Sequence, residues 1–247
     1  MGKLFGTDGI RGIVGKTLTA ELAFQVGQSV TVVLQEELGR NPLITIGKDT
    51  RISSDMLEAA LVAGICSVGG DALLLGTIPT PAVAFLTIQE KADAGVVISA
   101  SHNPFEYNGI KVFNAQGYKL SDAMEERVEQ LILNHAEMPV KSGSELGRCR
   151  NSAQEMHADY IDHLIATIGC DLSGLRVLVD CANGAAAAKT ILSFRAQRSR
   201  EIAATAYSKT AISPLATLGR NDMKGELGRN DKDGELGRND KVAVPNQ

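Results

Sequence analysis

Apolar residues in the N-terminal part of the chain recur at two alternating spacings. Apolar side chains at helical spacing follow Thr19, which can cap a helix, and Gly39 offers a stop. A short β-rich run at 43–47 then predicts a strand that ends in a polar turn. A second helix follows, and Ser53 or Ser54 can cap it. Strand, polar loop and helix therefore form the repeating unit of an α/β fold.

The same unit recurs further along the chain. Strands are predicted at 72–75 and 95–99, and a helix over 80–89 places Pro81 in its first turn. After a polar loop, a further strand is predicted at 110–113.

A charged helix is then expected over 121–135, and residues 139–152 have the composition of a linker. Another helix is predicted over 154–168. The apolar run 175–181 predicts a buried strand that closes on an Asn-Gly turn at 183–184. This second strand–turn unit indicates the start of a second α/β domain.

These patterns divide the chain into three parts. We expect the first domain to span 1–150, the beginning of the second domain to span 151–188, and a divergent tail to occupy 189–247. No element is predicted beyond Phe194, and we expect the tail to be disordered and to contribute no core, because its apolar content is too low to offset the entropy of ordering it. A nine-residue LGRND repeat begins at Leu218, Leu227 and Leu236.

Composition narrows the class of protein. With 44% apolar residues, the chain can build a packed core, and its net charge of −4 gives no general attraction for nucleic acid. The charge is uneven, since residues 1–188 carry 14 basic and 22 acidic side chains while the tail carries 11 and 7. No apolar run is long enough to predict a membrane span or a secretory leader, so a cytoplasmic protein is expected. The four cysteines are widely spaced, which favours buried free thiols over disulfides or a zinc site.

The first stretch with candidate chemistry is the glycine-rich segment FGTDGIRG at 5–12. Glycines such as Gly9 allow a close backbone approach to an anion, and Arg11 supplies a planar charged fork. A phosphate contact that includes Thr7, Gly9 and Arg11 fits this composition. A tight turn with Arg11 in an ordinary ion pair fits it equally well.

A second candidate, the polar loop that ends at Arg51, directly follows an apolar strand. In open α/β sheets, ligands bind at the carboxyl ends of the strands, so Arg51 is a candidate phosphate ligand. A loop that only caps the next helix is the alternative.

The third candidate is SASHNP at 99–104, which follows another apolar strand. Ser101 would stand at the sheet edge beside the His102 imidazole, in a turn fixed by Asn103 and Pro104, as a nucleophile would. Lys111 has the opposite strand parity to its apolar neighbours and is a candidate charge clamp or proton carrier. The alternative for Ser101 is an ordinary exposed loop serine.

Four motifs in this order and spacing, which are FGTDGIRG, GKDTRISS, SASHNP and NGIKVF, closely resemble those of the α-D-phosphohexomutases. The resemblance covers residues 1 to about 188. It implies a first domain with a mixed sheet flanked by helices, followed by the start of a second α/β domain.

The resemblance also implies an activity. The residues of the first and third motifs are most similar to those of members that interconvert glucosamine 6-phosphate and glucosamine 1-phosphate. These members act through a phosphoserine and a bisphosphate intermediate. Ser101 would be that phosphoserine and would also bind Mg²⁺ through its phosphate. Arg11 and Lys111 match family positions near it, and His102 and Arg51 are secondary members.

Cofactors and partners follow from the same resemblance. It implies Mg²⁺, glucosamine or glucose 1,6-bisphosphate as activator, a hexosamine phosphate substrate and a homodimer formed through the first domain. A member that acts on mannose or glucose phosphates is the alternative within the family. A non-catalytic interaction module is the alternative outside it.

The sequence also departs from the family pattern. In the family, a DGDxDR-type loop supplies the aspartate ligands of magnesium, and later loops bind the sugar and the phosphate. This sequence contains none of these loops. We therefore expect this chain not to turn over hexose phosphates by itself, and the aperiodic basic tail suggests an interrupted reading frame.

Overall fold

The computed structural model describes residues 4–7, 9–171, 178–187 and 205–207. Helices and short helical turns within them are α1 (Ala20–Leu38), α2 (Ile52–Ser67), α3 (Thr80–Gln89), α4 (Asp122–Leu133), the 3₁₀ turn η1 (Gly143–Glu145) and α5 (Ala153–Ala166). Strands are β1 (Ile10–Ile13), β2 (Leu43–Lys48), β3 (Asp71–Thr77), β4 (Ala94–Ile98), β5 (Tyr107–Asn114), β6 (Cys149–Asn151), β7 (Leu178–Asp180) and β8 (Thr205–Tyr207).

Six strands form one mixed sheet in the order β1-β5-β4-β2-β3-β6. Strands β4, β2, β3 and β6 run parallel, whereas β5 is antiparallel to both β4 and β1. This arrangement confirms the α/β class and the mixed sheet. In the part of the chain that the structure describes, no helix is long and apolar enough to cross a lipid bilayer.

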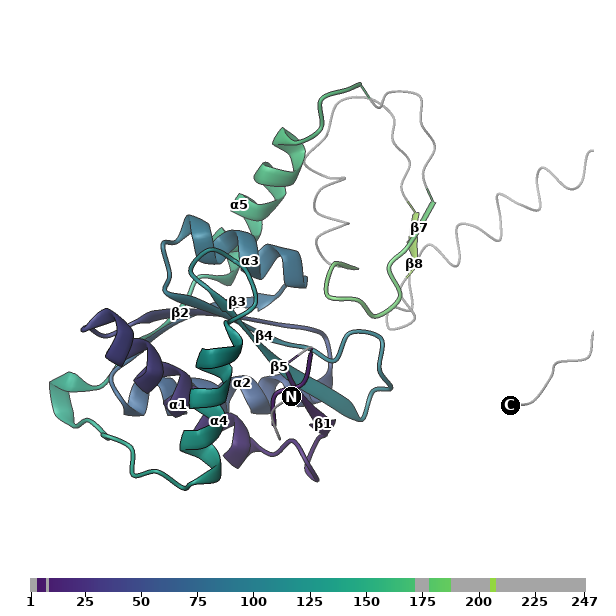
Figure 1. Cartoon of the computed structure of the whole chain (residues 1–247). Helices are drawn as coiled ribbons and strands as arrows, with labels where there is room; N and C mark the ends of the chain where they lie inside the picture. The colour runs from purple at the N-terminus through teal and green to yellow at the C-terminus, as the bar shows by residue number, and fades with distance from the viewer. Residues whose placement is uncertain (1–3, 8, 172–177, 188–204, 208–247) are drawn as a thin grey trace, which may run out of the picture. The chain divides into compact units, whose positions relative to one another are not determined.

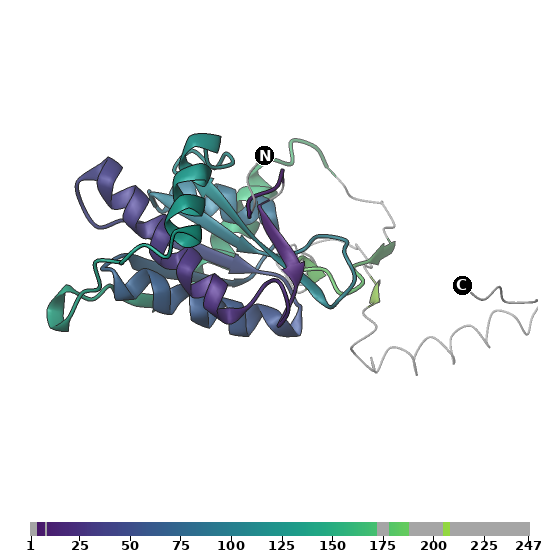
Figure 2. The same ribbon diagram turned by 60° about the horizontal axis from the view of Figure 1, so that its bottom comes forward.

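Helices cover both faces of this sheet. Figure 1 shows α3 and α5 on one side and α1, α2 and α4 on the other, and Figure 2 brings α1 and α4 forward. Along β4 the side chains alternate, so Val96 and Ile98 join the core under α1, α2 and α4, while Val97 joins the core under α3 and α5. The sheet is thus buried on both faces, and a buried polar residue within it, Thr45 of β2, hydrogen-bonds to Thr87 of α3 over 2.7 Å.

The helix termini mostly agree with the predicted caps. Thr19 Oγ1 accepts a hydrogen bond from the Leu22 amide, and Gly39 ends α1 in the left-handed region at φ 66°. The predicted serine cap of α2 is wrong, because α2 begins at Ile52, earlier than either serine, and Arg51 is its N-cap residue. The Ser54 hydroxyl instead donates to the Asp49 carboxylate.

The predicted linker is wrong in part. Residues 149–151 form β6, which pairs in parallel with β3 at the edge of the sheet. Helix α5 follows at once and packs on α3, where Phe85 stacks against His163 with ring centroids 3.9 Å apart. Since β6 contains no apolar run, only its pairing with β3 reveals that it belongs to the first sheet.

The second α/β unit is described only in part. Strand β7 lies within the predicted 175–181 strand and pairs in parallel with β8, and the Gly184 amide donates to the Cys181 carbonyl at the predicted turn. Strand β8 lies beyond Phe194, where the sequence pattern predicted no element. The nine-residue repeat and the rest of the predicted disordered tail lie outside the described residues.

Candidate active site

Two polar loops leave the sheet at one edge. The β2–α2 loop (residues 49–51) follows β2, and the serine turn (residues 99–104) follows β4, the parallel strand beside it. Parallel neighbours end at the same edge, which is where ligands bind in open α/β sheets. The Asp49 amide donates to the Ile98 carbonyl over 3.0 Å, and this bond joins the start of one loop to the end of the other strand.

The serine turn presents Ser101 to solvent. Its φ of 58° lies in the left-handed region, which costs an L-residue about 1–2 kcal/mol. The Ser101 amide donates to Ser99 Oγ at 3.0 Å, and the Asn103 amide donates to the Ala100 carbonyl at 3.1 Å. Ser101 Oγ lies 3.3 Å from Nδ1 of His102, and both side chains are exposed. An exposed hydroxyl in a strained turn is typical of a residue that accepts a transferred group.

The Arg51 guanidinium lies against the backbone of the serine turn. Its Nη1 donates to the Pro104 carbonyl at 2.7 Å, and its Nη2 donates to the carbonyls of Ser101 at 3.1 Å and Asn103 at 2.8 Å. On the other side, its Nε and its amide donate to the Asp49 carboxylate, each over 3.0 Å. We predicted Arg51 as a phosphate ligand, and in this structure its donors meet the protein's own oxygens.

Behind Asp49 lies a small buried polar network that the sequence analysis missed. Ser54 Oγ donates to Asp49 at 2.8 Å, and the fully buried Asn108 donates from Nδ2 to the hydroxyls of Ser54 and Ser53, each at 3.0 Å. Asn108 Oδ1 accepts the Gly109 amide at 2.8 Å. The available signal was the position of Asp49 directly after a buried strand and of Asn108 beside a glycine. Neither position tells whether the residue supports a loop or takes part in a reaction.

The second cation of the β2–α2 segment also turns inward. Lys48, the last residue of β2, pairs with Asp55 at 2.7 Å and with Glu58 of α2. Burial lowers the pKa of Lys48, but its hydrogen bonds to Asp55 and Glu58 outweigh that effect, so the pKa is raised. Lys48 therefore stays charged and bound to α2.

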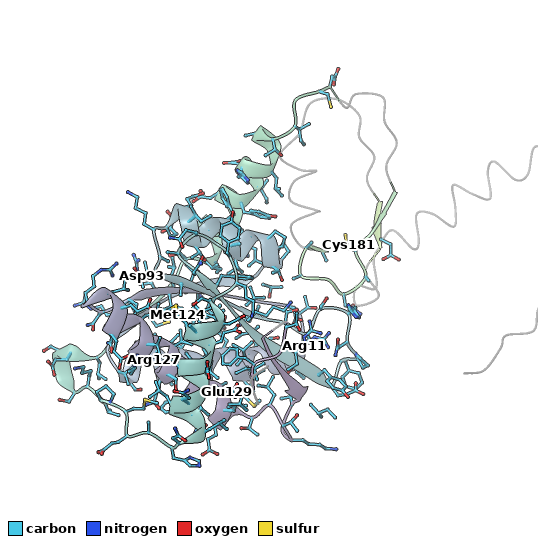
Figure 3. All side chains as sticks on the ribbon, viewed as in Figure 1. Arg11, Asp93, Met124, Arg127, Glu129 and Cys181 are labelled. Carbon is cyan, nitrogen blue, oxygen red and sulfur yellow. The ribbon has the colours of Figure 1, made fainter. Side chains whose placement is uncertain are left out.

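Arg11 reaches the serine turn from the other side. Strand β1 pairs with β5 so that Arg11 lies opposite Gly109, and Arg11 Nη1 donates to Asn103 Oδ1 at 3.2 Å. Figure 3 shows Arg11 at this edge of the sheet. Asn103 therefore contacts two arginines, with its side chain toward Arg11 and its carbonyl toward Arg51. The sequence predicted that Asn103 fixes the turn, but not that it contacts both arginines.

Glu129 of α4 fixes the segment that leads into β1. Its buried carboxylate accepts hydrogen bonds from the amides of Leu4 at 3.0 Å and Phe5 at 3.2 Å. Glu129 is labelled on α4 in Figure 3. This anchor lies far from Arg11 in sequence, so the sequence pattern contained no signal for it.

Gly9 and Thr7 occupy the turn before β1. The amide of Gly9 donates to the Gly6 carbonyl at 3.3 Å. Gly9 has a φ of 84°, and its Cα packs directly against the Ile110 carbonyl of β5. A side chain at Gly9 would clash with that carbonyl, so this glycine is required for close packing of the N-terminal segment on β5. Thr7 lies exposed in the same turn.

Lys111 stands on β5 with the predicted parity. Its neighbours Ile110 and Val112 point into the core under α1, α2 and α4, whereas Lys111 pairs with Val97 on β4 and is half-buried. Val97 precedes Ser101 by four residues, and among the described contacts none joins Lys111 to Ser101. The structure thus brings together Arg11, Arg51, Ser101 and His102, and places Lys111 on the strand between β1 and β4.

The described residues do not fit a magnesium site by themselves. Among them, no three His, Cys, Asp or Glu side chains gather where they could hold a metal ion. Asp49, the carboxylate in the β2–α2 loop, already binds Arg51 and Ser54. Arg51 and Arg11 contact the serine turn, at the Ser101 carbonyl and the Asn103 side chain, and arginines suit an anion such as a phosphoryl group.

All four cysteines are free thiols, as expected, but the expectation that they are buried is wrong for Cys149 and Cys170, which are exposed. Cys66, at the far end of α2, is partly buried. Burial first, and then the nearby Cys149 and Asp71, raise the pKa of the Cys66 thiol to about 11.

Comparison with known proteins identifies the family that has this fold and this candidate site at the edge of the sheet. Residues 2–138 match the family described as phosphoglucomutase/phosphomannomutase, alpha/beta/alpha domain I, and the chain belongs to that family. The putative phosphomannomutase from Thermus thermophilus superposes with a TM-score of 0.68 at 26% identity, over 83% of this chain and 46% of that one. A phosphoglucomutase/phosphomannomutase family protein from Burkholderia thailandensis, at 23% identity, shares the fold with a TM-score of 0.65 over 83% of this chain and 43% of that one.

Curated relatives are more similar in sequence. The phosphoglucosamine mutase of Acetivibrio thermocellus is 55% identical over 186 residues, which are 75% of this chain and 41% of that protein. The phosphoglucosamine mutase of Clostridium acetobutylicum is 54% identical over 198 residues, which are 79% of this chain and 43% of that protein. The chain thus spans about two fifths of the length of these relatives.

Proposed function

We propose that this chain is the phosphoserine-bearing part of a phosphoglucosamine mutase, which interconverts glucosamine 6-phosphate and glucosamine 1-phosphate through a bisphosphate. The single observation that carries the proposal is Ser101, exposed in a strained turn between two arginines at the carboxyl edge of the sheet. Identity of 54–55% to relatives with that name favours the amino sugar over glucose or mannose.

The proposed reaction has two phosphoryl transfers. In the first, an oxygen of the substrate's free hydroxyl bonds to phosphorus as the bond from phosphorus to Ser101 Oγ breaks, and the hydroxyl proton leaves to a base. This gives the hexosamine bisphosphate. After the bisphosphate turns over, Ser101 Oγ takes the other phosphoryl group and the isomerised monophosphate leaves. In such transfers, positioned cations stabilise the charge on the equatorial oxygens.

The described side chains can divide these tasks. Arg11, which reaches the turn at Asn103, would stabilise the phosphoryl charge, and Lys111 would carry the proton or add charge. His102, whose Nδ1 is near Ser101 Oγ, would hydrogen-bond to that oxygen in the unphosphorylated state. Thr7, exposed in its turn, would contact the substrate phosphate, with Gly9 shaping the backbone there.

Cofactor, partners and compartment belong to the same proposal. Family membership is consistent with a divalent metal, and we propose Mg²⁺ with the Ser101 phosphate as one ligand. The other metal ligands are not supplied by the described residues. Glucosamine or glucose 1,6-bisphosphate would charge the serine, and a homodimer through the first domain stays a prediction. Four free thiols favour a reducing compartment such as the cytoplasm.

A transfer experiment tests this function. The chain is incubated with glucose 1,6-bisphosphate and Mg²⁺, freed from donor, and then mixed with glucosamine 6-phosphate. We expect intact mass to show one phosphoryl group gained and then slowly lost in a single transfer, with glucosamine 1,6-bisphosphate formed. Repeated turnover is not expected, because the magnesium and sugar loops of the family are not found in this sequence. A Ser101→Ala chain serves as the blank.

Comparison of acceptors decides between the sugars. Faster loss of the phosphoryl group to mannose or glucose phosphates than to glucosamine 6-phosphate would contradict the amino-sugar proposal. A chain that takes up no phosphoryl group from glucose 1,6-bisphosphate would contradict the mutase proposal itself.

A further inference from the structure

The Arg51 side chain binds the backbone of the serine turn. Three of its hydrogen bonds go to carbonyls of the serine turn, at Ser101, Asn103 and Pro104, over 2.7–3.1 Å. Its Nε is taken by Asp49, and the side chains of both residues are about nine-tenths buried, with 12% and 13% of their surfaces exposed. A guanidinium is suited to this role, because its planar fork can meet several oxygens at once.

The hydrogen bonds form a chain that starts and ends at the serine turn. From the turn it runs through Arg51 to Asp49, and from Asp49 to Ser54. Ser54 bonds to Asn108, whose Oδ1 accepts the Gly109 amide.

The Gly109 carbonyl then accepts the Ser99 amide at 2.9 Å, which returns the chain to the turn. Ser99 in turn accepts the Ser101 amide through its Oγ. The serine turn is therefore held on both of its flanks by one connected set of buried polar groups.

The turn needs such support. A left-handed serine is disfavoured by about 1–2 kcal/mol, so Ser101 keeps this conformation only where the surroundings compensate. The exposed face of the turn cannot provide that compensation, since Ser101 and His102 both lie in solvent. The buried side, made by Arg51 and Asp49, can.

We propose that Arg51 and Asp49 are positioning residues that set the conformation of the serine turn for phosphoryl transfer, and that Arg51 is not a phosphate ligand. This inference rests on the proposed function of Ser101. It differs from a phosphate-binding role in one measurable respect: a lysine at position 51 keeps the charge but cannot span three carbonyls. Lysine should therefore rescue a phosphate ligand in part and a positioning residue hardly at all.

The experiment uses the full chain, with Arg51→Lys, Arg51→Met and Asp49→Asn. Arg40→Met is the matched control, because Arg40 also binds an aspartate, Asp93, away from both loops, and the Arg40 side chain itself is exposed. Two quantities are measured for each variant. One is amide exchange of the peptide covering 99–108, and the other is the rate of Ser101 phosphorylation over a range of glucose 1,6-bisphosphate concentrations.

We expect Arg51→Lys and Arg51→Met to behave alike. Exchange over 99–108 should rise about tenfold or more, the factor for one lost hydrogen bond of about 1.4 kcal/mol. The maximal phosphorylation rate should fall by about 10², as for a reacting group misplaced by about 1 Å, with the half-saturating donor concentration within about twofold of the parent. Asp49→Asn should show both effects more weakly, and Arg40→Met neither.

Other outcomes overturn the proposal. If Arg51→Lys retains the parent rate, or if the half-saturating donor concentration rises while exchange over 99–108 is unchanged, then Arg51 is a phosphate ligand. Exchange over α1 and β2 reports whether each variant is folded, and Asp49→Asn decides the matter if the Arg51 variants are not. If the parent chain takes no phosphoryl group, the proposed function fails, and exchange alone then shows whether Arg51 holds the turn.

Discussion

The β2–α2 loop and the serine turn leave neighbouring parallel strands at one edge, yet they expose their side chains to opposite degrees. Asp49 and Arg51 are nearly buried and bind protein groups, whereas Ser101 and His102 lie in solvent. Both loops are short, polar and placed where ligands bind. Position at the sheet edge therefore does not by itself identify a reactive residue, because one loop can serve as the support of the other.

The largest expected effect concerns the two cations on the strands beside the exposed serine turn. Lys111→Met or Arg11→Met should lower the rate of Ser101 phosphorylation by about 10² or more, because each removes a preorganised charge. The free energy of unfolding should change little, since neither side chain belongs to the core. Phosphorylation rate and denaturant midpoint are measured on the same samples, with the exposed Lys16→Met as control. A large stability loss at an unchanged rate would give both residues a structural role instead.

A smaller effect should appear on the buried side, in stability. Asn108→Ala removes the partner of two buried serine hydroxyls and of the Gly109 amide, which should lower the free energy of unfolding by about 2–3 kcal/mol. Asn103→Ala, on the exposed turn, should cost about 1 kcal/mol or less. Urea unfolding compares the two variants. Equal losses would contradict the difference in burial between the polar network behind Asp49 and the serine turn.

The smallest effect concerns the far end of α2. Because the pKa of Cys66 is raised to about 11, its thiol stays protonated at about pH 8, and iodoacetamide should alkylate it at least about tenfold more slowly than the exposed Cys170. The raised pKa means that the folded protein favours the protonated Cys66 thiol. The slow alkylation of Cys66 should therefore be lost as the pH rises toward 11 and the thiol ionises. Peptide mapping over a pH series measures both rates, and equal rates in the native chain would contradict the burial of Cys66.

Local chemistry made much of the fold predictable. Thr19 and Gly39 mark their helix because a hydroxyl cap and a left-handed glycine act within a few residues. Strand β6 was not predictable in this way, since its three exposed residues gain their structure only from pairing with β3. The start of α2 was also missed, because its N-cap residue, Arg51, makes no side-chain cap hydrogen bond that a sequence pattern could signal.

The site was predictable to a similar extent. The motif around Ser101 and the parity of Lys111 follow from residues next to one another in sequence, and the structure places both as expected. Glu129 and Asn108 act across long sequence separations, through packing that no local pattern encodes. Arg51 was identified from the sequence, but its contacts were not. An arginine at a sheet edge can bind a ligand anion or the protein's own carbonyls, and the sequence does not distinguish the two.

The central claim is that Ser101 accepts the phosphoryl group, and the most direct measurement is peptide mapping of the chain after incubation with glucose 1,6-bisphosphate. We predict one phosphate, on Ser101, with Ser99 unmodified and no incorporation in a Ser101→Ala chain. Phosphate on another serine with Ser101 bare, or equal incorporation in the Ser101→Ala chain, would contradict the account.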